Sequence, residues 1–282
     1  MATVGTSARL VVTRHLAKPP RANPGTRWKY GRADAVIAVS NAAAEAVKAS
    51  GVIRRPIDVI PGGVEMDRAI SAASSEVLAS FGVRANLPLV VGVGALVPQK
   101  DPLTFVRAIA VVRRLRPEMQ ALWVGDGELR EQVEREIARL ELGDTLHLAG
   151  FRADVDALMA AGDVFAMSSV FEGLPLVVMD AFALGVPVVA TAGSGVPELV
   201  DDATTGLLVP VGDADALGAA VARLLADREL AVALRETALV RAREYSIERT
   251  TERTLMVYER VLGPDHAEPN VRAPRAPQAR SR

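Results

Sequence analysis

Two acidic residues close to a glycine are the first side chains in this sequence with the chemistry of an active site. Seven residues separate Glu172 from Asp180, and Gly173 and Pro175 lie between them. The apolar run at residues 164–167 predicts a strand before this segment, and Pro175 suits the first turn of a following helix. A glycine at a helix N-terminus presents unpaired backbone N–H groups that can hold a diphosphate. Both acids can approach one crevice there, although a helix cap beside a solvated acid is the simpler alternative.

Repeated strand and helix patterns surround these acids. From residue 89 onward, short β-branched runs alternate with stretches that carry apolar residues at helical spacing, which is typical of a doubly wound parallel sheet. Strands are predicted at residues 89–93, 121–124, 145–148, 164–167, 188–190 and 206–209, and helices at residues 103–115, 128–140 and 214–225, with another ending within 181–185. We therefore predict an α/β fold with a complete Rossmann-like domain over residues 69–262.

The first 68 residues contain fewer strand signals, at residues 10–13, 36–39 and 58–60 only. Three strands make a poor independent sheet, so this segment is predicted to be a partial Rossmann-like domain. A turn at Pro61, Gly62 and Gly63 leads into a polar connection and places a domain boundary near residue 68. Residues 263–282 combine prolines and arginines without apolar periodicity, which predicts a disordered tail. The last helix before that tail is a candidate for return to the first domain.

Composition excludes several classes of protein. Half of the 282 residues are hydrophobic, which indicates a globular enzyme, and 33 Lys and Arg against 34 Asp and Glu argue against nucleic acid or an anionic membrane as the main partner. The absence of cysteine excludes disulfides, thiolate metal sites and cysteine nucleophiles. No signal-peptide pattern and no run of about 18 apolar residues is present. We predict a cytoplasmic enzyme, and peripheral association with the inner face of the membrane stays an open alternative.

The spacing of Glu172 and Asp180 resembles the Glu-x7-Glu element of the family 4 retaining glycosyltransferases, which have the GT-B fold of two Rossmann-like domains. Further segments resemble other sequence motifs of that family, in the same order along the chain. They are residues 33–40, 59–64, 93–96 with Lys100, 125–127, 150–151 and 195–198. The resemblance covers residues 10–262, and the combination is more specific than any single element.

The resemblance implies a donor site for a nucleotide-diphosphate sugar. Lys100 would neutralise the diphosphate, Asp180 would bind the ribose hydroxyls, and Glu172 would lie near the donor sugar. His15 would approach that sugar from the N-terminal domain, with Arg14 as an alternative phosphate-facing group. An exposed loop lysine and a structural histidine are the simpler interpretations of Lys100 and His15. The implied catalytic residues are His15, Lys100 and Glu172, and the implied donor-binding residues are Gly94, Lys100, Phe151, Arg152, Glu172, Gly173, Leu174, Leu176 and Asp180. Among these, Phe151 and Arg152 would face the nucleobase, and the amides after Gly173 would face the sugar and diphosphate.

Three departures from the family pattern limit this transfer of roles. The second acid is Asp180, one methylene shorter than the glutamate of the family. Ala95 stands where the family often has an arginine, so the diphosphate site has one positive charge fewer unless Arg14 substitutes for it. Strands that precede residue 10 in family members have no counterpart here, so the N-terminal domain is predicted to be truncated.

The implied reaction moves a sugar from a nucleotide-diphosphate sugar to an acceptor hydroxyl with retention of the anomeric configuration. Neither Glu172 nor Asp180 has a spacing that demonstrates a covalent nucleophile, and a glycosidase would need two acids on opposite faces of the bond. No metal or other cofactor is expected, because Lys100 and helix amides can stabilise the departing diphosphate. The acceptor is a glycan, a lipid-linked molecule or a small molecule. The alternatives are a non-catalytic nucleotide-sugar-binding remnant and, less supported, a sugar-nucleotide epimerase.

Overall fold

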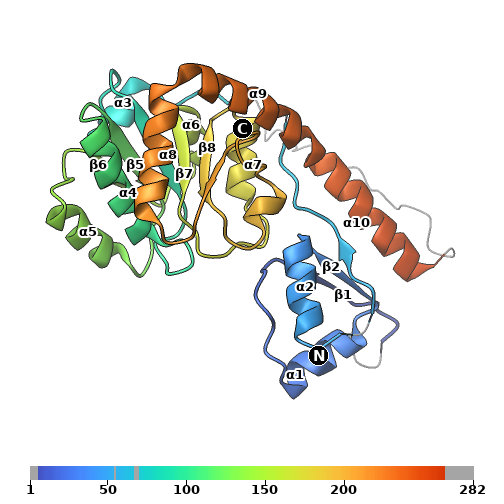
Figure 1. The fold of residues 1–282 in the computed structure, drawn as a ribbon. Coiled ribbons are helices and arrows are strands. Elements are labelled where there is room, and N and C mark those ends of the chain that lie inside the picture. The colour runs from blue at the N-terminus through green and yellow to red at the C-terminus, as the bar shows by residue number, and fades with distance from the viewer. Residues whose placement is uncertain (1–5, 54, 67–69, 264–282) are drawn as a thin grey trace, which may run out of the picture.

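The computed structural model describes residues 6–53, 55–66 and 70–263, which form a larger and a smaller lobe, each around a parallel sheet (Figure 1). The six strands of the larger sheet lie in the order β6-β5-β4-β7-β8-β9, so the chain changes direction across the sheet between β4 and β7. Ligands of open α/β sheets bind beyond the carboxyl ends of the strands at such a point. The strands are β4 (Leu89–Val93), β5 (Gln120–Val124), β6 (Leu146–Gly150), β7 (Val164–Met167), β8 (Val188–Thr191) and β9 (Leu207–Val209).

Helices cover both faces of this larger sheet because its strands are apolar on both sides, and β5, β7 and β8 are buried along their whole length. One core cluster joins the sheet to α4 and α8 and includes Phe105 and Trp123, whose rings meet edge to face at 5.0 Å between centroids. The helices of this lobe are α3 (Ser75–Ala79), α4 (Pro102–Leu115), α5 (Arg130–Arg139), α6 (Val155–Ala160), α7 (Leu176–Ala183), α8 (Ala214–Ala226) and α9 (Arg228–Glu244), with a 3-10 turn, η1 (Val196–Glu198).

The smaller lobe contains a three-stranded parallel sheet in the order β1-β2-β3. Its strands are β1 (Val11–Arg14), β2 (Ala35–Ala38) and β3 (Asp58–Val59), and its helices are α1 (Pro24–Arg32) and α2 (Asn41–Ala49). Helix α1 begins at Asn23, whose side chain accepts a hydrogen bond from the N–H of Thr26, and α2 is capped in the same way by Ser40. Val12, Val36 and Val47 form a small core between the sheet and these helices.

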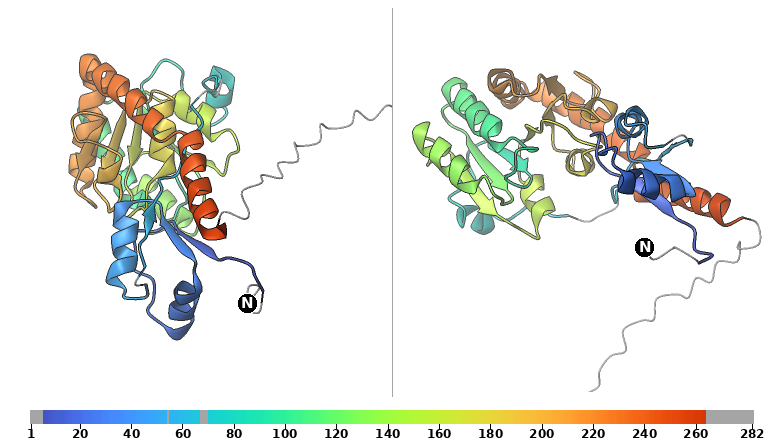
Figure 2. Two further views of the ribbon diagram at one scale, coloured as in Figure 1. Left: turned by 90° about the vertical axis from the view of Figure 1, so that its right-hand side faces the viewer. Right: turned by 90° about the horizontal axis from the view of Figure 1, so that it is seen from below.

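Helix α10 (Ile247–Leu262) follows α9 and runs from the larger lobe to the smaller lobe (Figures 1 and 2). Val257 of α10 packs with Ala35 and Ile37 of β2, and Arg260 forms an ion pair of 2.5 Å with Asp58 of β3. The C-terminal helix therefore completes one face of the N-terminal sheet.

The predicted α/β class is confirmed, and all nine predicted strands are present with ends that differ by no more than two residues. The predicted tail lies mostly outside the described residues, as does the predicted boundary, since residues 67–69 and 264–282 are not described. Among the described helices, none is both long enough and apolar enough to cross a bilayer.

Candidate active site

The candidate active site lies at the carboxyl ends of β4 and β7, where the strand order reverses. The loop after β4 and the loop after β7 are joined by backbone contacts. The N–H of Val170 donates to the C=O of Gln99 at 2.8 Å, and the Ser168 hydroxyl lies 2.9 Å from the C=O groups of Lys100 and Asp101. These contacts fix the backbone of Lys100 against the segment that carries Glu172.

An ion pair between Lys100 and Glu172 is the centre of this arrangement. Nζ of Lys100 lies 2.6 Å from Oε1 of Glu172, and Glu172 is only 6% exposed. The side-chain amide of Gln99 donates through Nε2 to the C=O of Phe171 at 3.1 Å and to Oε2 of Glu172 at 3.4 Å. A carboxylate at this depth requires a cation and hydrogen bonds, because desolvation of an unpaired charge is costly. The two residues predicted to act on the donor are therefore in direct contact.

The position of Lys100 depends on the residue that follows it. Asp101 adopts a left-handed backbone conformation with a φ of 44° and caps α4 through hydrogen bonds from the Thr104 N–H at 3.2 Å and the Thr104 hydroxyl at 2.6 Å. This turn directs the chain from the end of β4 into α4 and leaves the Lys100 side chain over Gly94, because a Cβ built on Gly94 would lie 3.3 Å from Cγ of Lys100. Lys100 thus connects the end of β4 to Glu172.

Gly173 brings the two lobes into backbone contact. A Cβ at Gly173 would lie 2.0 Å from the C=O oxygen of His15, and a Cβ at Gly195 would lie 1.8 Å from the C=O oxygen of Gly173. Three chain segments therefore meet at a separation that only glycine allows. Pro175 stands at the N-cap of α7 and gives no side-chain cap to its first amides.

The other predicted donor residues occupy α7 and its entry. Leu174 is buried, whereas Leu176 is 52% exposed and its side chain lies beside Gly62 of the smaller lobe. Asp180 is partly buried one turn into α7, and its C=O accepts a hydrogen bond from the N–H of Leu184 at 2.9 Å. The predicted role of Asp180 with the ribose stays a prediction.

A pocket of ≈ 240 Å³ lies at the carboxyl ends of β4 and β5. Gly94, beside the Lys100 side chain, lines it together with Asp126, Phe151 and Arg152. Phe151 is 86% exposed and offers an aromatic surface. Arg152 makes a bidentate pair with Asp154 at 2.8 Å, and these hydrogen bonds raise the pKa of Arg152 and lower the pKa of Asp154.

His15 and Arg14 lie in the loop that follows β1 and faces Gly173. The His15 side chain is exposed, and its backbone contributes the close contact described above. The Arg14 guanidinium donates to the C=O groups of Leu16 at 3.0 Å and of Lys18, so it organises this loop. Nζ of Lys18 lies 5.8 Å from the centroid of the Phe171 ring, next to Glu172.

Glu198 is a contact residue to which sequence reasoning gave no role. Its carboxylate accepts hydrogen bonds from the backbone N–H groups of Asn41 at 2.8 Å and Ala42 at 2.6 Å, at the N-terminus of α2. A carboxylate is favourable there because the unpaired amides carry partial positive charge. Glu198 of the larger lobe therefore binds the N-terminus of α2 in the smaller lobe. A local sequence pattern cannot predict this contact, because the two residues are 157 positions apart.

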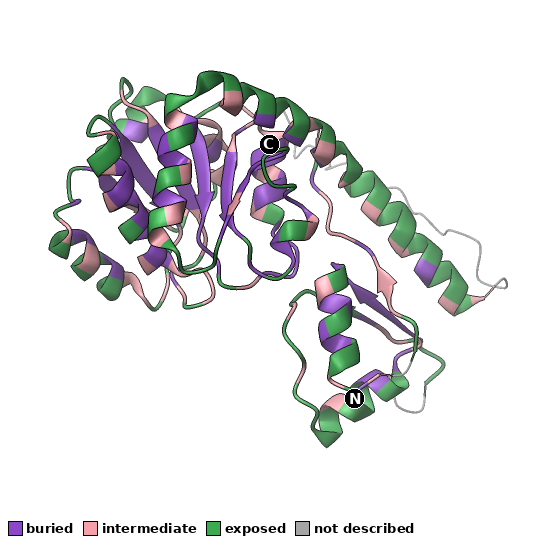
Figure 3. Cartoon of the chain, in the orientation of Figure 1, coloured by how far each residue is buried: buried purple, intermediate pink, exposed green. Residues whose placement is uncertain are grey.

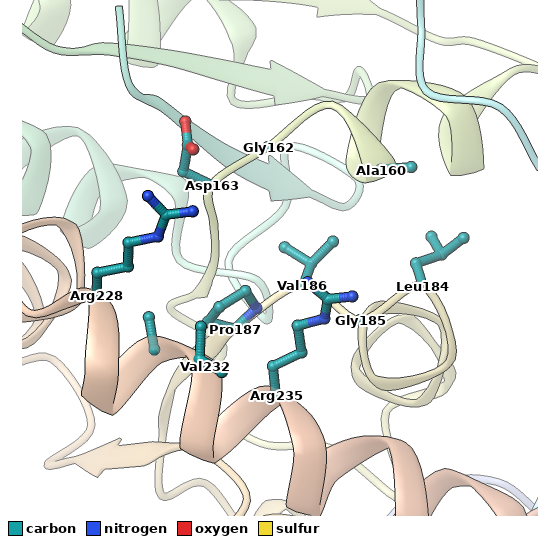
Figure 4. Close-up of a pocket in the computed structure, with 11 residues that line it drawn as sticks. Ala160, Gly162, Asp163, Leu184, Gly185, Val186, Pro187, Arg228, Val232 and Arg235 are labelled. Atoms are coloured by element: carbon teal, nitrogen blue, oxygen red, sulfur yellow. The ribbon is translucent and has the colours of Figure 1, made fainter.

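A second pocket, of ≈ 440 Å³, lies at the opposite edge of the larger sheet (Figure 4). Its lining includes Asp163 and Pro187, which directly precede β7 and β8, and Arg228 and Arg235 of α9. This position is at the amino ends of the strands, so it is separate from the site around Lys100. Among the described residues there is no cluster of three or more His, Asp or Glu side chains that could hold a metal ion.

Two Rossmann-like lobes, each built on a parallel sheet, are the GT-B fold of glycosyltransferases, as predicted. The crystal structure of Anabaena Alr3699/HepE in complex with UDP has a TM-score of 0.81 and 26% sequence identity to this chain, and the match covers 92% of this chain and 74% of that one. The chain belongs to the glycosyl transferases of group 1, whose family model matches residues 75–241, and the Glycosyltransferase Family 4 model matches residues 2–68.

Two curated relatives show the breadth of this family. The lipopolysaccharide core biosynthesis glycosyltransferase LpsE of Rhizobium meliloti is 32% identical over 212 residues, which are 75% of this chain and 60% of that protein. The UDP-Gal:alpha-D-GlcNAc-diphosphoundecaprenol alpha-1,3-galactosyltransferase of Escherichia coli is 32% identical over 179 residues, which are 62% of this chain and 46% of that protein. The chain spans about half the length of these relatives.

Proposed function

We propose that this chain binds a nucleotide-diphosphate sugar and transfers its hexosyl group to an acceptor hydroxyl with retention of the anomeric configuration. The observation that carries the proposal is the continuity of the site. A pocket with an exposed aromatic ring is bordered by Gly94, over which the stem of Lys100 lies. The ammonium group of Lys100 contacts Glu172, and the uncapped start of α7 follows along the chain. Base, diphosphate and sugar would occupy these parts in that order.

The chemistry of this proposal is electrostatic. The bond from the anomeric carbon to the diphosphate breaks as negative charge develops on the leaving diphosphate, and Lys100 and the first amides of α7 would stabilise that charge. No metal is required for this step in the proposal, because these groups supply the positive charge. The ammonium group of Lys100 would contact both the Glu172 carboxylate and the diphosphate. Asp180 would bind the ribose hydroxyls.

Retention would follow from attack on the face from which the diphosphate leaves. We propose no covalent intermediate, because the Glu172 carboxylate is buried and already paired with Lys100. His15 would approach the donor sugar from the smaller lobe, and its C=O oxygen is already in contact with Gly173. The loop after β7, which carries Glu172 and Gly173, and the loop after β1 would then enclose the sugar together.

The similar proteins suggest where to begin with substrates. HepE binds UDP, and the Escherichia coli relative uses a uridine diphosphate sugar and a lipid-linked diphosphate acceptor according to its name. We therefore propose a uridine diphosphate sugar as the first donor to test, and a glycan or a lipid-linked sugar as the acceptor.

Calorimetric titration of the purified chain with UDP, GDP and ADP tests the donor site. One of the three is expected to bind, and Lys100→Ala and Asp180→Ala should each weaken it at least tenfold. Lys48→Ala is the control, because Lys48 forms an exposed ion pair with Glu45 on α2. No binding of any nucleotide by folded wild-type protein would refute the proposal.

Hydrolysis of UDP-glucose tests the stereochemistry without an identified acceptor. Water would replace the acceptor hydroxyl, and proton NMR would record the anomer that forms first. Release of the α-anomer is expected for retention, and first release of the β-anomer would contradict it. Binding of UDP without any hydrolysis or transfer would instead favour a non-catalytic nucleotide-sugar-binding protein.

A further inference from the structure

The first part of the chain is strongly and uniformly basic. Residues 1–33 contain seven Lys and Arg and no Asp or Glu, although the whole chain has a net charge of −1. Two of these cations are engaged inside the smaller lobe, since Arg9 pairs with Asp34 at 3.3 Å and Arg14 binds carbonyl groups of its own loop. The remaining five are all exposed, and they are Lys18, Arg21, Arg27, Lys29 and Arg32.

Four of these cations form no ion pair within the part of the chain that the structure describes. Among the described residues, no carboxylate forms an ion pair with Lys18, Arg21, Arg27 or Lys29. Helix α1 buries only Tyr30, so most of its surface is exposed (Figure 3). It lies at the end of the smaller lobe that is remote from the six-stranded sheet (Figures 1 and 2). The exposed cations of α1 therefore lie at this remote end of the smaller lobe.

An exposed aromatic ring and a small pocket lie beside the cations of α1. Trp28 is 50% exposed on α1, and the guanidinium of Arg32 lies 5.5 Å from its ring centroid. Arg27 and Arg55 line a pocket of ≈ 290 Å³ between α1 and the turn after α2. Tryptophan has an amphipathic ring that favours the water–lipid interface, and arginine binds phosphate groups with paired hydrogen bonds.

We propose that the basic surface of α1 and of the segment before it, formed by Arg21, Arg27, Trp28, Lys29 and Arg32, docks on the surface of an anionic lipid bilayer. Charge complementarity selects that partner, and Trp28 adds an interfacial contact that a purely polar polyanion would not need. The inference rests on the proposed function in one respect, since a lipid-linked acceptor would be reached from such a surface.

Vesicle binding tests the proposal without any nucleotide, so its result is independent of the donor titration. Vesicles of phosphatidylcholine alone are compared with vesicles that also contain phosphatidylglycerol at roughly 30%, which gives a moderately anionic surface. Only the anionic vesicles should sediment the protein. Binding should fall steeply from 0.1 M to 1 M salt, because the screening length falls from about 10 Å to about 3 Å.

A triple variant identifies the surface. Arg21→Gln, Arg27→Gln and Lys29→Gln together should weaken binding roughly 100-fold, since each cation near an anionic membrane contributes about a factor of five. The matched control removes three exposed cations of α9 by Arg228→Gln, Arg235→Gln and Arg243→Gln, and it should bind as the wild type does. Equal melting temperatures would show that both variants are folded.

Trp28 provides a spectroscopic readout at the same place. The chain has two tryptophans, and the other, Trp123, is only 3% exposed within the core. Anionic vesicles should shift the emission of Trp28 to shorter wavelength, and Trp28→Phe should abolish the shift. Equal binding to both kinds of vesicle, or unchanged binding by the first triple variant, would overturn the proposal. Binding to a single-stranded DNA oligonucleotide but to no vesicle would overturn it in favour of nucleic acid.

Discussion

Removal of the ammonium group from the Lys100–Glu172 pair should destabilise the larger lobe. Lys100→Met keeps most of the side-chain volume and leaves the Glu172 carboxylate, which is 6% exposed, with Gln99 as its remaining side-chain partner. Breaking a buried ion pair in this way costs about 3–5 kcal/mol. The Lys100 side chain is 22% exposed, so water can reach the pair and the expected cost is reduced to about 2–3 kcal/mol.

A thermal melt followed by circular dichroism measures this cost. For a unit of this size, about 1 kcal/mol shifts the midpoint by roughly 2–4 °C, so Lys100→Met should melt about 5–10 °C below the wild type. Glu172→Gln in the same chain removes the stranded charge, and the double variant should recover about 1–2 kcal/mol of the loss. Lys48→Met is the control, since both members of its pair with Glu45 are more than half exposed, and it should shift the midpoint by no more than about 2 °C.

Two results would refute this reasoning. A Lys100→Met variant that melts with the wild type would show that solvent already compensates Glu172. Additive effects of the two single substitutions would show that the charges do not interact, whatever their separation of 2.6 Å.

Two other substitutions probe contacts around the site, and a third probes the ion pairs of Glu136 on α5. Glu198→Ala leaves the first amides of α2 without their acceptor and should cost about 1–3 kcal/mol, measured by thermal melting against the exposed control Glu45→Ala; equal midpoints would contradict the inter-lobe contact. Gly173→Ala would place a methyl group 2.0 Å from the C=O oxygen of His15, so it should lower both the melting midpoint and the affinity for UDP. Gly143→Ala is the control, because its methyl group would meet no atom within 4 Å, and it should change the stability by less than about 1 kcal/mol. Hydrogen bonds from Arg139 and Arg107 lower the pKa of Glu136 from 4.5 to about 2. That stabilisation is present above pH 4.5 and is lost as the pH falls towards 2, so the midpoint difference between wild type and Glu136→Gln should shrink over that range; a constant difference would exclude the linkage.

The strands of the larger lobe were predictable because a parallel sheet covered on both faces requires continuous apolar runs. The run at residues 164–167, for example, is buried at every position of β7. The order of the strands was not predictable from these runs. The residues at 89–93 do not indicate that this strand pairs with the strand at 164–167. Helix α1 was missed because Gly25, Gly31 and several charged residues obscure its periodicity, although Asn23 before Pro24 is a recognisable helix start.

Local spacing found only part of the candidate site. It singled out Glu172, Gly173 and Asp180, and the family resemblance added Lys100. It did not predict that Lys100 and Glu172 would neutralise each other, because that contact joins residues 72 positions apart. The same reason explains why Glu198 received no role: its partners belong to the other lobe, and their approach depends on how α10 and the loops bring the lobes together.

The net charge of the chain does not describe how its charges are distributed. A total of −1 argues against an anionic membrane as the main partner of the whole chain, and that stays a prediction. Electrostatic attraction depends on charges within a screening length of about 8–10 Å and not on a sum over 282 residues. Residues 1–33 carry seven cations and no acid, and the fold places five of those cations at the exposed surface of one lobe. A near-zero total therefore conceals a strongly basic lobe and an acidic one, and the distribution of charge along the chain carries the information that the total removes.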